Sequence, residues 1–208
     1  VIMTTRWSTR TRPAYLGWLS LAAHELFHAW NGKRLRPVEL GPFDYENENH
    51  TTGLWMAEGF TEYYADLLLR RAGLSSESEF LQALSANIDS VQTTPGRLVQ
   101  PVGMASFDAW IKYYRPDENS ANTSISYYSK GATGGARTLD EVMRAAYDRY
   151  SGRRGYSPEE FRALVEEVAG PSESLRSWFA GGVESAAELD YGEALDWFGL
   201  RFRDGANA

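Results

Sequence analysis

The sequence has 208 residues, 43% of them hydrophobic, so the chain is long enough to bury one sizeable core. Its 28 acidic and 21 basic side chains give a net charge of −7, which argues against a nucleic-acid partner. It contains no cysteine, so disulfides and thiolate metal ligands are excluded, and no apolar run approaches the roughly 20 residues of a membrane span.

The first part of the chain predicts one short strand and two long helices. β-branched residues favour the strand, and apolar residues at helical spacing favour the helices, at residues 1–5, 15–31 and 53–72. The pair Asn31-Gly32 and the single Gly73 are expected to end the two helices, because both residue types tolerate a left-handed backbone.

The rest of the chain predicts further helices and a final strand. A third helix is expected after Ser75, because a serine-rich start is followed by Glu79 and by apolar residues at helical spacing until Pro95. Residues 97–124 are expected to be irregular apart from one short helix. The other helices are expected at about 108–114, 138–150, 158–168, 172–180 and 184–189, and a strand at 195–202. The sequence therefore predicts a mainly α fold, organised as one compact unit over 1–208.

The run His24-Glu25-Leu26-Phe27-His28 lies inside the first long helix. Residues four apart share one face of a helix, so the two imidazoles can converge on one metal ion. Glu25 lies beside that face, where its carboxylate can take a proton from a water molecule as a general base. The spacing is typical of a catalytic zinc helix.

A catalytic zinc site needs a third protein ligand and an open fourth position. The chain has only three histidines, and His50 lies in a polar loop where a solvent-exposed role is expected. Glu58 opens the amphipathic second helix and is the better candidate, so the sequence predicts one Zn²⁺ ion on His24, His28 and Glu58. The alternative is that the two histidines are ordinary core residues. Burying them and the glutamate there without a partner would cost several kcal/mol.

With both runs in view, the chain resembles the glycyl aminopeptidase family of gluzincin zinc metallopeptidases, whose catalytic domain is often followed by a PDZ domain. The similar stretches are HELFHAWNGKRLRP (24–37), LWMAEGFTEYYADLLLRRAGL (54–74), ISYYSKGA (125–132) and TLDEVMRAAYDRY (138–150). The resemblance implies a thermolysin-like catalytic domain with zinc on the same three ligands and Glu25 as the general base.

The resemblance also implies a role for Tyr128, in the run Tyr128-Ser129-Lys130-Gly131. In this kind of peptidase the phenol of a Tyr-x-Lys-Gly run donates to the oxyanion of the tetrahedral intermediate. A neutral donor aimed where charge develops stabilises the transition state more than the substrate. From the residues alone, Tyr127 and Tyr128 would be interpreted as core or surface aromatics.

Two further residues are candidates for orienting the ligands. Glu62 follows Glu58 by one helical turn and can accept the free ring N–H of a histidine. A solvated helix glutamate is the alternative. Asn31 lies one turn after His28 and has the same two interpretations.

The sequence departs from the family pattern at two places. After Ala132 the family continues with an apolar helix, whereas this chain goes directly to the Gly-rich run 133–135. We therefore expect a lost helix or an omitted segment there. An upstream β-rich domain and a downstream PDZ domain are not in residues 1–208, so we expect a catalytic domain from a longer protein. The residues that separate exopeptidase from endopeptidase action are expected upstream.

The residues predict a zinc-dependent peptidase, and the resemblance implies an aminopeptidase that removes Gly or Ala from the N-terminus of peptide substrates. Two alternatives remain open: a zinc- or peptide-binding fragment with little activity of its own, and a zinc hydrolase of another bond type. The bacterial cytoplasm and the periplasm are both compatible with the sequence. The sequence also leaves the oligomeric state open.

Overall fold

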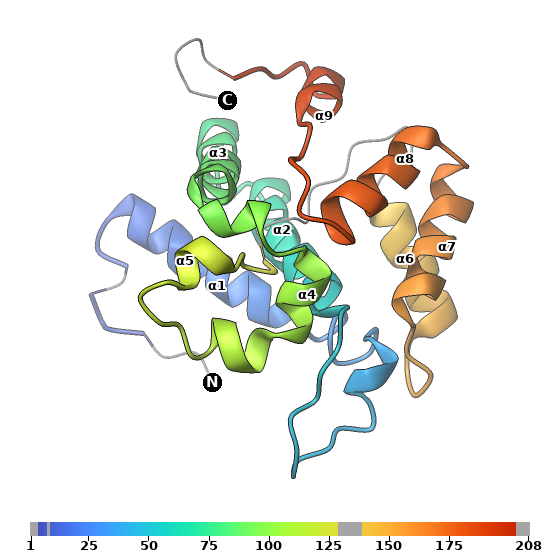
Figure 1. Cartoon of the computed structure of the whole chain (residues 1–208). Helices are drawn as coiled ribbons and strands as arrows, with labels where there is room; N and C mark the ends of the chain where they lie inside the picture. Colours follow the sequence, from blue (N-terminus) through green and yellow to red (C-terminus); the bar gives the residue numbers. More distant parts are fainter. Residues whose placement is uncertain (1–3, 8, 129–138, 203–208) are drawn as a thin grey trace.

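The computed structural model describes residues 4–7, 9–128 and 139–202, and this part of the chain is mainly helical (Figure 1). The α-helices are α1 (Arg12–Phe27), α2 (Leu54–Arg71), α3 (Glu77–Thr93), α4 (Val102–Phe107), α5 (Ser120–Thr123), α6 (Leu139–Tyr150), α7 (Pro158–Ala169), α8 (Glu173–Trp178) and α9 (Gly192–Trp197). The 3-10 turns are η1 (Val38–Leu40) and η2 (Pro95–Leu98), and the π-helical turns are η3 (Ala109–Tyr113) and η4 (Phe179–Val183). The described residues contain isolated β-bridges and no strand, so the mainly α prediction is confirmed.

Local signals in the sequence set the ends of the long helices. The side chain of Thr11 accepts a hydrogen bond from the amide of Ala14 in the first turn of α1. Helix α1 begins at Arg12, three residues before the predicted start. The end of α1 is four residues earlier than predicted, because the chain tightens into turns after Phe27. Gly73, with φ of +71°, ends α2 as predicted, and the next amide, of Leu74, bonds back to the carbonyl of Leu69.

Two later helices begin with the same reciprocal motif. The side chains of Ser76 and Ser157 each accept a hydrogen bond from the amide three residues later. In return, Glu79 and Glu160 each accept one from the amide of the capping serine. These capping boxes satisfy amides that a helix start leaves unpaired, and they explain why the starts of α3 and α7 were predictable.

The predicted strand at 195–202 is wrong, because α9 continues to Trp197 and residues 198–202 form a turn and irregular chain. Gly199, with φ of +66°, closes this helix. The amide of Leu200 then bonds to the carbonyl of Leu195 at 2.8 Å, and the amide of Gly199 bonds to the carbonyl of Asp196 at 3.0 Å. This pair of bonds is a helix-ending motif that requires the left-handed glycine.

Other differences concern short elements. The predicted helix at 184–189 is wrong, since these residues form bends and irregular chain after η4. The stretch 97–124 was expected to be mostly irregular, yet it contains α4 and α5, which are too short for periodicity to reveal. Of the predicted N-terminal strand, residues 1–3 lie outside the described residues, and Thr4 and Thr5 form no strand.

Helix α2 lies at the centre of the fold and positions the site (Figure 1). It buries nine of its 18 residues. Phe60 packs on Phe161 of α7 with ring centroids 5.7 Å apart, and Trp55 packs on Trp178 of α8 at 6.0 Å. Aromatic pairs of this kind stabilise a core by about 0.5–1.5 kcal/mol beyond their buried area. Helix α1 packs along α2, and none of the described helices has the length and apolarity to cross a bilayer.

Candidate active site

Helix α1 supplies the first two residues of the predicted metal site. His24 is the only buried residue of α1, and His28 is the cap residue at its C-terminal end. The two rings meet edge to face with centroids 4.6 Å apart, and their Nε2 atoms lie 3.0 Å from each other. A spacing of one helical turn therefore brings both imidazoles to one point.

Helix α2 delivers Glu58 to the same point. Its Oε2 atom lies 3.2 Å from Nε2 of His24 and 3.2 Å from Nε2 of His28, so the three atoms form a nearly equilateral triangle. Ligand atoms held about 2.0–2.1 Å from a tetrahedral zinc ion are separated by about 3.3 Å, close to these distances. In the part of the chain that the structure describes, this is the one such group of three potential ligands. The donor set and its geometry fit a zinc ion.

The charges within this triangle favour an anionic carboxylate. Burial by itself would raise the pKa of Glu58, but hydrogen bonds from the His24 and His28 rings outweigh it and hold that pKa well below its usual range. For His24, burial would lower the pKa, and the contacts of its ring with the Glu58 and Glu62 carboxylates raise it instead. A proton bound among these groups must leave when a metal ion replaces it.

The outer nitrogen of each histidine also has a partner. Nδ1 of His28 lies 2.8 Å from the backbone carbonyl of Asn31, which can only accept a hydrogen bond. A proton is therefore on Nδ1, so Nε2 is the nitrogen that would present its lone pair to a metal ion once its own proton has left. Nδ1 of His24 lies 2.9 Å from Oε2 of Glu62, in an ion pair that is not a straight hydrogen bond. Such partners fix the orientation of ligating imidazoles.

The side chain of Asn31 has a separate task. It is buried, and its amide nitrogen lies 2.9 Å from the carbonyl of Met56, 2.9 Å from that of Ala57 and 3.1 Å from Oγ1 of Thr61. The amide therefore joins the loop after α1 to α2 on either side of Glu58. The sequence indicated Asn31 as a partner of His28, and only the structure separates the backbone contact from the side-chain one.

We expect Asn31→Ala to lower the free energy of unfolding by about 2 kcal/mol, because it removes the buried hydrogen bonds to Met56, Ala57 and Thr61. Denaturant unfolding followed by circular dichroism measures the change. Asn122→Ala, at an exposed asparagine, is the matched control and should change the stability by less than about 0.5 kcal/mol. Equal stabilities of the two variants would show that the Asn31 side chain does not stabilise the packing of the loop after α1 on α2.

The two neighbouring tyrosines occupy different environments. Tyr127 is fully buried, and its hydroxyl donates to that of Tyr114 at 3.1 Å. The ring of Tyr128 stacks on Tyr127 with centroids 4.8 Å apart and lies 5.9 Å from the ring of His24. Burial, followed by the charge of Glu58, raises the pKa of Tyr128, so its phenol stays a neutral O–H. Of the pair, Tyr128 is therefore the one whose ring lies beside the candidate ligand His24.

Gly59 allows the tyrosine segment to approach α2 closely. A Cβ atom at this position would lie 3.2 Å from the carbonyl oxygen of Tyr127 and 3.4 Å from that of Tyr128. The absence of a side chain next to Glu58 therefore sets the distance between the ligand helix and the tyrosines. A glycine inside a helical pattern is the signal that predicts such an approach.

The remaining predicted residues lie as follows. Glu25 is exposed on α1, and it makes no hydrogen bond or ion pair with any of the residues that the structure describes. Its carboxylate is thus free to meet a water molecule or substrate. His50 is exposed, and its Nδ1 lies 3.0 Å from the carbonyl of Phe107, away from the ligand triangle. Of the predicted Tyr-Ser-Lys-Gly run, residues 129–131 lie outside the described residues.

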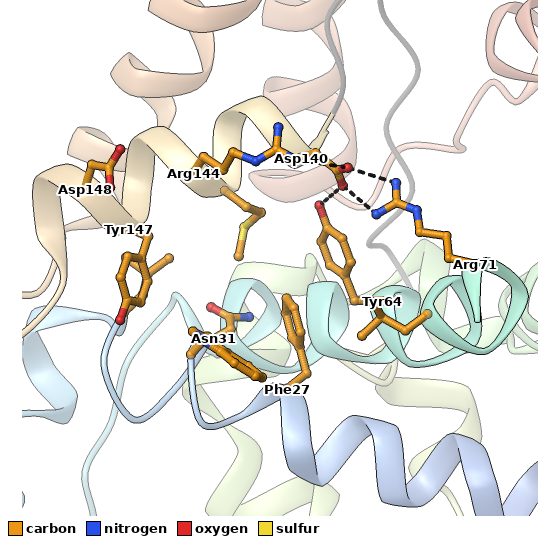
Figure 2. A pocket seen from close by; sticks show the side chains of 12 residues that line it. Phe27, Asn31, Tyr64, Arg71, Asp140, Arg144, Tyr147 and Asp148 are labelled. Atoms are coloured by element: carbon orange, nitrogen blue, oxygen red, sulfur yellow. Dashed lines mark hydrogen bonds and ion pairs between the residues drawn. The ribbon is translucent and has the colours of Figure 1, made fainter.

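A cavity of about 510 Å³ lies between α1, α2 and α6 and is separate from the ligand triangle (Figure 2). At one end, the hydroxyl of Tyr64 donates to Asp140 at 2.7 Å, and Arg71 pairs with the same carboxylate at 2.9 Å. The ring of Phe27 stacks on that of Tyr64 with centroids 4.7 Å apart. These contacts tie α6 to the two helices that carry the candidate metal ligands.

Comparison with known proteins gives the family of the chain. A family model described as M61 glycyl aminopeptidase matches residues 17–133, more than half of the chain and including all three candidate ligands. The chain belongs to this family. A search of curated protein sequences returns no match.

The M61 family assignment is accompanied by a similar solved structure. It is described as the crystal structure of an aminopeptidase N family protein from Idiomarina loihiensis, with 28% sequence identity and a TM-score of 0.81. The match covers 94% of this chain and 34% of that one, so the chain spans about a third of the length of this relative. The likeness extends over the C-terminal helices, beyond the residues that the family model matches.

Proposed function

We propose that this chain contains the active site of a zinc-dependent peptidase, an aminopeptidase that removes small N-terminal residues such as Gly and Ala. The observation that carries the proposal is the triangle formed by Nε2 of His24, Nε2 of His28 and Oε2 of Glu58, with sides of 3.0, 3.2 and 3.2 Å. Glu25, which is unpaired among the described residues, lies beside His24 on α1. The M61 family supports peptide substrates, and its description as glycyl aminopeptidases supports the small residue.

In the proposed site, His24, His28 and Glu58 would hold the zinc ion. When bound, zinc supplies a Lewis acid that polarises the scissile carbonyl and makes water more acidic. Glu62 and the carbonyl of Asn31 keep the two imidazoles oriented through their outer nitrogens. Charge balance also fits, because two neutral imidazoles and one carboxylate leave a positive charge to attract a carbonyl oxygen.

Glu25 is proposed to take the proton from the attacking water and to pass it to the nitrogen of the leaving amine. One helical position separates it from His24, so the base and the ligand move as one rigid unit. The hydroxyl of Tyr128 is proposed to donate a hydrogen bond to the carbonyl oxygen, which becomes negative as the water attacks. Its raised pKa supports this role, since the phenol keeps its proton across the neutral range.

Activity on paired substrates tests the proposal. The purified chain, with and without added zinc, is offered glycyl and alanyl amides, the matching esters, and N-acetylated peptides of the same sequence. We expect zinc-dependent cleavage of the free-amine amides and none of the acetylated peptides. Zinc binding without any cleavage would favour a binding fragment, and cleavage of esters alone would favour a hydrolase of another bond.

We expect Gly59→Ala to lower kcat about three- to tenfold, because the new Cβ displaces the Tyr127–Tyr128 backbone by a few tenths of an ångström. Alanine also favours helix by up to about 1 kcal/mol, so the unfolding midpoint should not fall in parallel. Steady-state kinetics and thermal unfolding separate the two effects.

Gly17→Ala is the matched control for this substitution. Gly17 is also inside a helix, but a Cβ atom there would meet nothing within 4 Å. It should gain helix stability without any change in kcat. If both variants retain full activity, the close approach at Gly59 has no catalytic importance.

A further inference from the structure

The stack around Tyr128 includes a residue that no part of the sequence pattern indicated. A hydroxyl donor acts on a developing charge only when its ring is held within about 0.5 Å of the productive position. Among the described residues, the Tyr128 ring contacts three others: Tyr127 at 4.8 Å, Tyr113 at 5.8 Å and His24 at 5.9 Å between centroids. Tyr127 and His24 are buried, so Tyr113 is the outer wall of the stack.

Tyr113 comes from η3, the π-helical turn Ala109–Tyr113. Insertions of this kind change the direction in which a side chain projects and are frequent at functional sites. The ring of Tyr113 lies 4.9 Å from that of Tyr127, tilted by 53°, and 42% of the residue is exposed. It therefore touches both tyrosines of the segment while keeping one side in solvent.

Hydrogen bonds that do not involve Tyr113 also hold the base of the stack. The hydroxyl of Tyr127 is bonded to that of Tyr114, and the amide of Tyr128 donates to Oγ of Ser126 at 3.3 Å. These bonds hold the backbone and the buried ring, but they do not hold the ring of Tyr128 itself. Removing Tyr113 would therefore free one side of the Tyr128 ring while these hydrogen bonds remain in place.

We propose that Tyr113 is a positioning residue, which holds the ring of Tyr128 beside His24 through ring packing from the π-helical turn. This inference rests on the proposed function, in which the phenol of Tyr128 stabilises the oxyanion. The contact uses the ring of Tyr113 and not its hydroxyl, for which the described residues offer no hydrogen-bond partner.

The first test compares Tyr113→Ala with Tyr113→Phe in the zinc-loaded protein. Tyr113→Ala should lower kcat about tenfold, with KM and zinc content unchanged, because the ground state does not use the Tyr128 hydroxyl. Tyr113→Phe should restore the wild-type kcat, since it keeps the ring. A Phe variant as impaired as the Ala variant, or a change in KM alone, would overturn the proposal.

Trp110→Ala is the matched control. Trp110 belongs to the same π-helical turn and is 45% exposed, but its ring contacts Tyr114 and not Tyr128. Its removal should leave kcat unchanged. A loss equal to that of Tyr113→Ala would mean that the turn as a whole, and not this ring, is responsible.

A second test needs no activity. Fluorotyrosine placed at position 128 reports the packing of that ring by fluorine NMR in the metal-free protein. Tyr113→Ala should shift and broaden the resonance, whereas Tyr113→Phe and Trp110→Ala should leave it near the wild-type position. An unchanged resonance in Tyr113→Ala overturns the positioning role. A changed resonance in a protein that cleaves no peptide supports the packing and overturns the proposed function alone.

Should Tyr113→Ala fail to fold, Tyr113→Leu replaces it in both tests. Leucine fills much of the volume but has no ring face, so a partial loss of kcat and a shifted resonance are expected. Wild-type values for Leu in both tests would overturn the proposal.

Discussion

Glu25→Gln is expected to lower kcat for glycyl and alanyl amides by about 10³-fold, the usual contribution of a general base. The amide keeps the size of the carboxylate but cannot accept the proton of the attacking water. Because Glu25 is not one of the three triangle residues, zinc content should remain at one ion per chain. Steady-state kinetics and metal analysis of the same preparation provide the two measurements.

Glu118→Gln is the matched control for this substitution, since Glu118 is also exposed and lies on a turn outside the metal-ligand group. It should keep wild-type kcat. Peptidase activity that survives Glu25→Gln would remove Glu25 from the mechanism. A simultaneous loss of zinc would show that Glu25 supports the metal and not only the proton transfer.

Glu58→Gln is expected to weaken zinc binding by more than about 100-fold. About 100-fold is the largest loss of metal affinity expected for a residue that only orients a ligand. The substitution keeps the shape of the side chain and removes the negative charge, which the two histidines stabilise at neutral pH. Competition with a chromogenic chelator measures the affinity. Kinetic activity should fall with zinc occupancy and return only partly when excess zinc is added.

Glu62→Gln provides the graded comparison. The carboxylate of Glu62 contacts the outer nitrogen of His24 and is not part of the triangle. Removing its charge should therefore weaken zinc binding by about 10–100-fold. His50→Ala should have no effect, because that ring contacts Phe107 on an exposed loop. Wild-type zinc affinity in Glu58→Gln, or a large loss in His50→Ala, would identify a different third ligand.

The sequence predicted the long helices because their determinants are local. Capping residues such as Ser76 and Ser157 satisfy the first amides of a helix, and Gly73 satisfies the last carbonyls. The same reasoning applies to His24 and His28, whose convergence follows from the helical repeat alone. In contrast, α4, α5 and α9 are one or two turns long, too short for a periodic pattern, so they were missed or predicted as another structure.

The sequence by itself determined the mainly α class, the pairing of two histidines on one helix face and the residue types fit for zinc. It also predicted Glu58 as the third ligand, and the tertiary structure gives the distances of 3.2 Å to the two imidazoles. Only the tertiary structure decided that the side chain of Asn31 bonds to α2 and that Tyr128 packs on Tyr113. The physical reason is one of range: helical spacing fixes neighbours within one turn. Contacts between α1, α2 and the 113–128 region depend on how the elements pack, which Gly59 and the central core of α2 decide.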